Sequence, residues 1–128
     1  MALKDSLSVM FVDDMATSRG LIIMALEEMG IKKIDFRTNG ADALQSLVAK
    51  PVHLVISDYN MPGMDGLGLL KALRENRITS RIGFILVSGR ITPEIMTTGK
   101  ALGMNNYIQK PFSTPQLKGC IQAVTGPL

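Results

Sequence analysis

The chain has 128 residues, with 14 Lys or Arg and 11 Asp or Glu, which gives a formal net charge of +3. A hydrophobic fraction of 46% and a charged fraction of 20% are typical of a folded chain and exclude extensive disorder. Because this length suits one domain, we expect a single domain over residues 1–128. One Cys and one His exclude an internal disulfide bond and a zinc site made of Cys and His.

Membrane and export signals are not visible in the sequence. The longest apolar runs, such as 83–87, are far shorter than the roughly 20 residues that a spanning helix needs. The first residues lack the charged region followed by an apolar stretch that marks a signal peptide. We therefore expect a soluble, cytoplasmic protein with no membrane partner.

Short apolar segments alternate with segments of helical periodicity along the chain. The expected strands are 7–12, 34–37, 52–57, 82–87 and 107–109, and the expected helices are 17–29, 41–49, 67–75, one from 93 onward and 115–124. In the first of these helices, one apolar face is expected from Leu21, Ile22, Ala25, Leu26 and Met29.

Strands that are apolar throughout indicate a parallel sheet with helices on both faces. Thr92 is a candidate N-cap, with Pro93 at the first position of the helix that follows. The sequence therefore predicts an α/β domain with a doubly wound, five-stranded parallel sheet and five helices. Ligands of such folds bind outside the carboxyl ends of the strands.

Polar side chains follow four of the expected strands at the point where each strand ends. Asp13 and Asp14 come after the first strand, Asp58 after the third, Ser88 after the fourth and Lys110 after the fifth. Because the carboxyl ends of parallel strands share one edge of the sheet, we expect these five side chains to lie together. Any one of them could simply cap a helix, but capping does not account for all five at one edge.

Three carboxylates in one place repel one another and need a cation to stay ionised. Oxygen ligands favour Mg²⁺, which binds few protein groups and keeps several waters. A carboxylate beside Mg²⁺ is also a nucleophile toward phosphorus and forms an aspartyl phosphate. A lysine and a hydroxyl are groups that neutralise a transferring phosphoryl group. These residue types therefore suit a Mg²⁺ site at which a carboxylate can accept a phosphoryl group.

Nucleotide-binding motifs are not found where such a site needs them. The chain has no GxxxxGK[ST] phosphate loop, and no GxGxxG follows the first strand. His53 and Cys120 are interpreted as structural residues, and Met10, Met24 and Met29 as core residues.

Four motifs together carry a resemblance to a known family. They are FVDD at 11–14, SDYNMPGMDG at 57–66, VSG at 87–89 and KPF at 110–112. Over essentially the whole chain they resemble the receiver domain of bacterial two-component response regulators, and most closely the single-domain chemotaxis regulators of the CheY type. The resemblance implies a flavodoxin-like fold with strand order 2-1-3-4-5 and no output domain.

The resemblance implies an acceptor and a set of metal ligands by position. Asp58 corresponds to the phosphoacceptor and also contacts the metal. Asp14 corresponds to a direct Mg²⁺ ligand, whereas Asp13 acts largely through water. Asn60 corresponds to the position whose backbone carbonyl completes the Mg²⁺ site.

Other positions correspond to the family's switch and to its phosphoryl-contacting group. Ser88 matches the switch hydroxyl, and Tyr107 matches the switch aromatic residue. Lys110 matches the lysine that contacts the phosphoryl group, and the bond between Lys110 and Pro111 matches the family's cis peptide.

The function implied is that of a signalling protein and not of an enzyme, since it promotes only its own phosphorylation and dephosphorylation. A histidine kinase (CheA-like) would phosphorylate Asp58, and a flagellar motor switch protein would bind the phosphorylated form. The docking face implied consists of the helix from 93, the strand 107–109 and the helix 115–124. A monomer is expected.

Three alternatives remain open at this point. The first is a phosphate sink or phosphorelay shuttle without motor binding, because one domain suffices for either role. The second is a Mg²⁺-dependent hydrolase with an aspartyl phosphate, which the adjacent pair Asp13 and Asp14 disfavours because such enzymes carry Asp-x-Asp. The third is a metal-bound adaptor that is never phosphorylated, which the presence of Asp58 and Lys110 disfavours.

Basic residues concentrate in the second half of the chain. Residues 71–128 contain 8 basic and 2 acidic residues, but no basic run and no interleaved aromatic residues. This pattern disfavours a nucleic-acid partner and is compatible with a simple solvated surface. The functional interpretation is an acidic protein partner that Arg90, Lys100 and Lys118 attract to the docking face.

Overall fold

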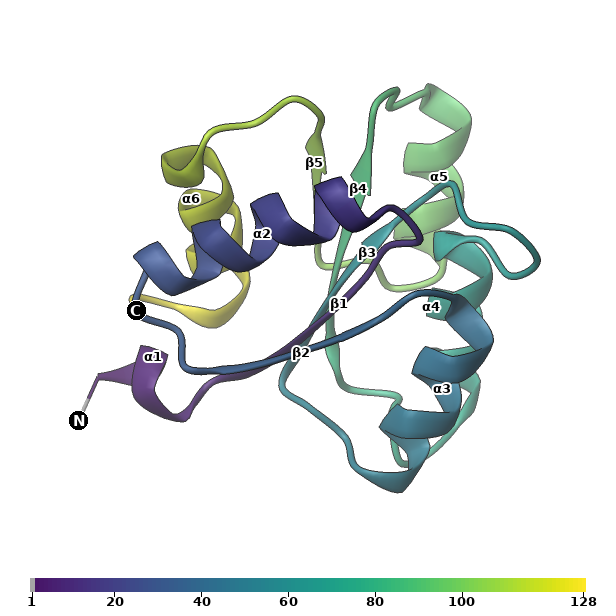
Figure 1. Cartoon of the computed structure of the whole chain (residues 1–128). Helices are drawn as coiled ribbons and strands as arrows, with labels where there is room; N and C mark the ends of the chain where they lie inside the picture. Colours follow the sequence, from purple (N-terminus) through teal and green to yellow (C-terminus); the bar gives the residue numbers. More distant parts are fainter. Residues whose placement is uncertain (1) are drawn as a thin grey trace.

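The computed structural model describes residues 2–128 and shows a central sheet with helices on both faces (Figure 1). The strands are β1 (Ser8–Val12), β2 (Lys33–Arg37), β3 (Leu54–Asp58), β4 (Gly83–Ser88) and β5 (Asn106–Gln109). The helices are α1 (Leu3–Ser6), α2 (Ala16–Glu28), α3 (Gly40–Ala49), α4 (Gly66–Glu75), α5 (Pro93–Ala101) and α6 (Thr114–Thr125). None of the helices in residues 2–128 combines the length and the apolar character that crossing a bilayer requires.

All strand pairs are parallel, and the strand order is β2-β1-β3-β4-β5, as predicted. The register pairs Val12 with Ser57 and Asp58 with Val87, so the ends of the three central strands are nearly level. The residues that end these strands therefore meet at one edge of the sheet. This is the crevice where α/β folds of this kind bind their ligands.

Two hydrophobic cores lie on the two faces of the sheet, because successive side chains of a strand point to opposite sides. On one face, Val9 and Phe11 of β1 pack with apolar residues of α2 and α6. On the other face, Met10 and Val12 pack with apolar residues of α3 and α4. Full burial of a side chain of this size stabilises the fold by roughly 1.5–3 kcal/mol.

Side-chain N-caps begin the four helices that follow β2, β3, β4 and β5; they are Asn39, Asp65, Thr92 and Ser113. The prediction of Thr92 as a cap with Pro93 at the start of the helix is confirmed. At the start of α4, Oδ1 of Asp65 accepts a hydrogen bond from the Gly68 N–H at 2.7 Å. This cap ends the loop that follows Asp58.

Gly66 allows α4 to begin directly against the end of β3. A Cβ atom at this position would lie 2.5 Å from the carbonyl oxygen of Asp58, which is closer than such atoms approach one another. The Gly66 N–H donates to the carbonyl oxygen of Tyr59 at 2.9 Å. The backbone that carries Asp58 is therefore held firmly against α4.

The prediction of five helices is wrong by one, because a single helical turn, α1, precedes β1. A turn of four residues is too short to show an apolar periodicity, so the sequence pattern could not reveal it. Its Leu3 side chain packs against the core of the α2 and α6 face.

The predicted apolar face of α2 is wrong in part. Ile22, Ala25 and Leu26 are buried, but Leu21 is 65% exposed. Met24, predicted as a core residue, is 61% exposed. Because consecutive helical residues are about 100° apart, a helix that buries Ile22 and Ala25 turns the side chains just before them toward solvent. Of the other methionines predicted in the core, Met10 and Met29 are buried.

Candidate phosphoryl-acceptor site

Three carboxylates meet at the carboxyl edge of the sheet. Asp13 and Asp14 directly follow β1, and Asp58 is the last residue of β3. One carboxylate oxygen from each lies within 4.8 Å of the others. Asp13 is 0% exposed and Asp58 is 8% exposed, whereas Asp14 is open to solvent. The predicted convergence of these side chains is confirmed.

Backbone contacts hold Asp13 in place from several sides. Its Oδ1 accepts a hydrogen bond from the Met15 N–H at 2.9 Å, and its backbone N–H donates to the Arg37 carbonyl at 3.1 Å. The guanidinium of Arg19 in α2 donates to the Asp13 carbonyl at 3.0 Å. The Oδ2 atom is buried and has no hydrogen-bond partner among residues 2–128. A buried carboxylate oxygen in this condition calls for a cation.

Lys110 supplies the positive charge closest to the carboxylates. Its Nζ lies 3.5 Å from Oδ1 of Asp58 and 3.7 Å from Oδ2 of Asp13. Both distances are longer than those of a charged hydrogen bond, so the ammonium attracts both groups without saturating either. The peptide bond between Lys110 and Pro111 is cis, as the family resemblance implied. The Lys110 N–H donates to the Ser88 carbonyl at 2.8 Å, which extends the pairing of β4 with β5 past the strand ends.

Burial raises the pKa of Asp58 above its ordinary value of 3.8. Attraction by Lys110 lowers this pKa, and repulsion by the Asp13 carboxylate raises it, but desolvation is the largest effect. The cost of desolvating the ionised carboxylate therefore outweighs its attraction to Lys110.

The donor set fits a hard divalent cation. Three carboxylates carry three formal negative charges, and Lys110 offsets one of them. The buried Oδ2 of Asp13 and the exposed carboxylate of Asp14 offer oxygen atoms that no other residue saturates. These observations agree with an acidic, oxygen-only site for a divalent metal.

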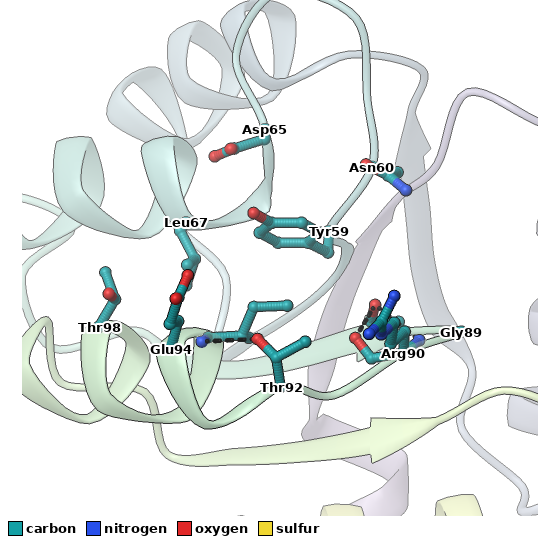
Figure 2. A pocket seen from close by; sticks show the side chains of 11 residues that line it. Tyr59, Asn60, Asp65, Leu67, Gly89, Arg90, Thr92, Glu94 and Thr98 are labelled. Carbon is teal, nitrogen blue, oxygen red and sulfur yellow. Dashed lines mark hydrogen bonds between the residues drawn. The ribbon is translucent and has the colours of Figure 1, made fainter.

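A solvent-open hollow of about 690 Å³ adjoins this edge of the sheet (Figure 2). Tyr59 and Asn60 line it from the loop after β3, and Ser88 and Arg90 line it from the end of β4. The Ser88 hydroxyl donates to the Arg90 carbonyl at 2.9 Å and accepts from the Arg90 N–H at 3.2 Å. In this conformation the hydroxyl is bonded to its own loop and not to Asp58.

The predicted switch aromatic residue lies on an edge strand and is partly open to solvent. Tyr107 belongs to β5, an edge strand of the sheet, and its side chain is 41% exposed. Lys100 on α5 and Lys118 on α6 are also exposed. Of the three basic residues predicted near this face, Lys100 and Lys118 lie on α5 and α6, whereas Arg90 lies in the loop between β4 and α5.

Arg19 is a site residue that the sequence analysis did not identify. Besides bonding the Asp13 carbonyl, its guanidinium lies over the ring of Phe36, 5.3 Å from the ring centroid. The spacing offered one signal, since Arg19 lies in the first helical turn after the acidic pair. Its partner, however, is a backbone carbonyl, which no residue type reveals.

Comparison with known proteins agrees with this architecture. The sequence matches the model of the response regulator receiver domain over residues 9–122. It is 38% identical over 128 residues to the probable chemotaxis protein CheY of Rhizobium etli, a match that covers 100% of this chain and 99% of the relative. It is 29% identical over 116 residues to the chemotaxis protein CheY-3 of Vibrio cholerae, covering 91% of this chain and 89% of the relative.

Solved structures show the same fold. The structure of Vibrio cholerae CheY4, crystallised at low pH, matches with a TM-score of 0.86 and 28% sequence identity. The match covers 92% of this chain and 98% of that chain. The chain therefore belongs to the response regulator receiver domain family of two-component systems, with CheY-type chemotaxis regulators among its relatives.

Proposed function

We propose that Asp58 accepts a phosphoryl group from the phosphohistidine of a histidine kinase, in a reaction that depends on Mg²⁺. The observation that supports this proposal is the arrangement of three carboxylates with oxygens within 4.8 Å of one another and an ammonium 3.5 Å from Asp58. The unpartnered Oδ2 of Asp13 explains why the arrangement needs a cation.

In the transfer, a carboxylate oxygen of Asp58 forms a bond to phosphorus, and the bond from phosphorus to the imidazole nitrogen breaks with its electron pair left on nitrogen. Mg²⁺, when bound, neutralises charge on the phosphoryl oxygens. Asp14, Asp58 and the backbone carbonyl of Asn60 would hold it directly, and Asp13 would act largely through water. The ammonium of Lys110, which lies beside the Asp58 carboxylate, contacts the transferred phosphoryl group. Attack by water on the acyl phosphate restores the carboxylate.

The phosphorylated form differs from the unmodified one through Ser88 and Tyr107. The Ser88 hydroxyl gives up its bonds to Arg90 and donates to a phosphoryl oxygen, because the new dianion is a stronger acceptor than a carbonyl. The movement of Ser88 changes the space beside β5 and lets Tyr107 turn inward. Phosphorylation in this way shifts the population between two conformations.

The output surface consists of α5, β5 and α6. Lys100 and Lys118 on this surface attract an acidic segment of the partner and speed association at low salt. Because the relatives are chemotaxis proteins, we infer that the partner is a flagellar motor switch protein. The alternative is a phosphate sink or relay shuttle that takes phosphate from a shared kinase without motor binding.

The surface next to Lys110 suits the phosphodonor protein. Leu21 and Met24 are exposed on α2, and Leu21 borders an apolar hollow of about 290 Å³ that Lys110 and Phe112 also line. A donor that brings its histidine to Asp58 must cover this edge of the domain. An apolar helix of the donor packing on Leu21 and Met24 explains their exposure.

Phosphorylation with acetyl phosphate and Mg²⁺ tests the acceptor. Intact-mass spectrometry should show one added phosphoryl group on the wild type and on Asp35→Asn, a control at an exposed aspartate that pairs with Arg37 outside the site. Asp58→Asn should show none. Labelling of Asp58→Asn at the wild-type level contradicts the assignment.

A second experiment separates motor output from a phosphate sink. Binding of the purified motor switch protein should be measured with and without acetyl phosphate. Binding that strengthens on phosphorylation of Asp58 supports the motor assignment. Equal binding in both states, or none, favours the sink or shuttle.

The donor surface has its own test with a matched control. Leu21→Glu should slow phosphotransfer from the cognate kinase and leave labelling by acetyl phosphate unchanged. Gln45→Glu adds the same charge at an exposed position of α3, outside the donor surface. It should alter neither rate. Equal kinase rates for wild type and Leu21→Glu would overturn the donor assignment.

A further inference from the structure

Two neighbouring hollows meet at the segment before β3, and neither is lined by a carboxylate of the phosphoryl-acceptor site. The first, of about 490 Å³, lies between β2 and α3, and the second, of about 570 Å³, lies against the loop from α4 to β4. Val52 and His53 line both hollows and form the wall between them. The two hollows therefore make one continuous surface, which we call the basal surface.

Most of the charged side chains that line the basal surface are basic; they are Lys33, Arg37 and Lys50 in the first hollow and Arg77 and Arg81 in the second. The only carboxylate that lines either hollow is that of Asp35, which pairs with Arg37 at 2.8 Å. For the other four cations, no carboxylate of residues 2–128 lies within ion-pairing distance.

Helix ends account for only part of this charge. Helices α3 and α4 end at the basal surface, and each carboxyl terminus carries roughly half a negative charge. Two such ends offset about one of the four unpaired cations. The potential of the basal surface therefore remains positive, and its hollows concentrate that potential more than a flat surface does.

His53 contributes the N–H of its imidazole ring as a hydrogen-bond donor at the wall between the hollows. Its Nδ1 lies 2.9 Å from the backbone nitrogen of Ser8, whose N–H can only donate, so Nδ1 acts as the acceptor. Nε2 therefore carries a ring proton, and its N–H can donate to a ligand because the side chain is exposed. The lining thus offers ammonium, guanidinium and N–H donors, the groups that bind carboxylates.

We propose that the basal surface docks an acidic segment of a partner protein, independently of phosphorylation at Asp58. Aliphatic side chains also line the hollows, among them Val52, Ile78 and Ile82, and Ile78 is 56% exposed. They suit a peptide in which acidic and aliphatic residues alternate. Apart from the imidazole of His53, none of the lining residues is aromatic, so the row of rings on which single-stranded nucleic acids stack is not formed here.

The position of the basal surface gives this contact a specific consequence. An acidic segment bound there leaves the carboxylate edge of the sheet and the α5–β5–α6 surface uncovered. The partner holds the domain at high local concentration while the phosphorylation site remains free to react. Because the attraction comes from exposed charges, the binding weakens steeply as salt rises.

The proposal is tested on the full chain with a fluorescein-labelled peptide of alternating Glu and Val, by fluorescence anisotropy at low salt. The double variant with Lys50→Glu and Arg81→Glu should bind the peptide at least about tenfold more weakly than the wild type. A control with the same change in net charge combines Lys32→Glu with Lys71→Glu, which lie outside both hollows. It should stay within about twofold of the wild type.

Further measurements complete the test. Peptide affinity should be the same with and without acetyl phosphate and Mg²⁺, and the Lys50 and Arg81 variant should still be labelled at Asp58. An equal loss of binding in both double variants overturns the proposal, because only net charge would then matter. The proposal is also overturned if the protein binds single-stranded DNA or anionic vesicles more tightly than the peptide and the Lys50 and Arg81 substitutions abolish that binding. The surface would then serve another ligand.

Discussion

Two charge centres at opposite ends of the sheet differ in how completely their hydrogen bonds are satisfied. At the carboxyl edge, Asp13 is fully buried and its Oδ2 has no hydrogen-bond partner among residues 2–128. Toward the amino end, the half-buried guanidinium of Arg74 donates to four oxygens. They are the carbonyls of Ser80 at 3.0 Å, Ile82 at 2.7 Å and Gly103 at 2.9 Å, and Oδ1 of Asn105 at 3.1 Å.

The comparison distinguishes a charge that holds the fold together from charges that need a ligand. No carboxylate of residues 2–128 pairs with Arg74, yet its bonds join the end of α4 to the segments that lead into β4 and β5. Burial lowers the pKa of this guanidinium, which stays protonated because an arginine starts from such a high value. The carboxylates, in contrast, repel one another and retain unused acceptor capacity. Unmet hydrogen bonding, and not charge alone, marks the functional end.

The largest expected effect is on the affinity for Mg²⁺, and it should differ between substitutions of Asp13 and Asp14. The exposed carboxylate of Asp14 forms no ion pair within residues 2–128, whereas Oδ1 of Asp13 accepts a hydrogen bond from the Met15 N–H. We therefore expect Asp14→Ala to weaken Mg²⁺ binding roughly 100-fold and Asp13→Ala roughly tenfold. Calorimetric titration measures both, with Asp35→Asn as the control. Equal affinities of the two alanine variants would contradict this ranking.

Replacing Arg74 should destabilise the fold without touching the chemistry. Arg74→Met keeps much of the aliphatic stem but leaves four oxygens without their donor, so we expect a loss of about 2–3 kcal/mol in the free energy of unfolding. Arg74→Lys should recover only part of that loss, because an ammonium lacks the planar fork of donors. Urea titration measures the stability. The folded fraction should be labelled by acetyl phosphate at the wild-type rate, and slower labelling would show that the two ends are coupled.

The sequence analysis predicted the carboxylate end far better than the Arg74 end. Strand-end residues can be located because a parallel sheet brings them to one edge wherever the exact strand boundaries lie. The Arg74 contacts reach residues up to 31 positions away and end mostly on backbone carbonyls, which every residue type carries. The exposure of Leu21 could not be predicted from the sequence for a related reason. Helical periodicity locates an apolar face only to within about one residue, or 100°.

Neutralising the acceptor should stabilise the metal-free protein. Burial and the Asp13 carboxylate raise the pKa of Asp58, so its ionised form is disfavoured in the folded state. We expect Asp58→Asn to be more stable than the wild type in a chelator at neutral pH, because the desolvation of the ionised carboxylate outweighs its attraction to Lys110. Asp35→Asn should not gain, because it breaks an ion pair instead.

Added Mg²⁺ should make the wild type more stable than Asp58→Asn, which is the reverse of their order in chelator. A ligand that binds only the folded state stabilises it by RT ln(1 + [L]/Kd), about 2.7 kcal/mol at a concentration of 100 Kd. The wild type keeps all three carboxylates and should gain more than Asp58→Asn. A wild type that is the more stable protein in chelator would show that the carboxylates are satisfied without a cation, and the contrast with Arg74 would fail.

The smallest expected effect concerns Cys120, a half-buried thiol on α6, and the dependence of stability on pH. Unlike the carboxylates and Arg74, this group is kept uncharged by burial. Burial raises the pKa of its thiol from 9.0 to about 11, and Sγ contacts the Tyr107 carbonyl at 3.5 Å. Between these values the unfolded chain loses the proton first, so the free energy of unfolding should fall as pH rises from about 9 to about 11. Cys120→Ala should flatten this part of the pH profile. Iodoacetamide at pH 8 should modify the native thiol much more slowly than the thiol in urea. Equal rates would show that the thiol is as open to solvent as the Asp14 carboxylate.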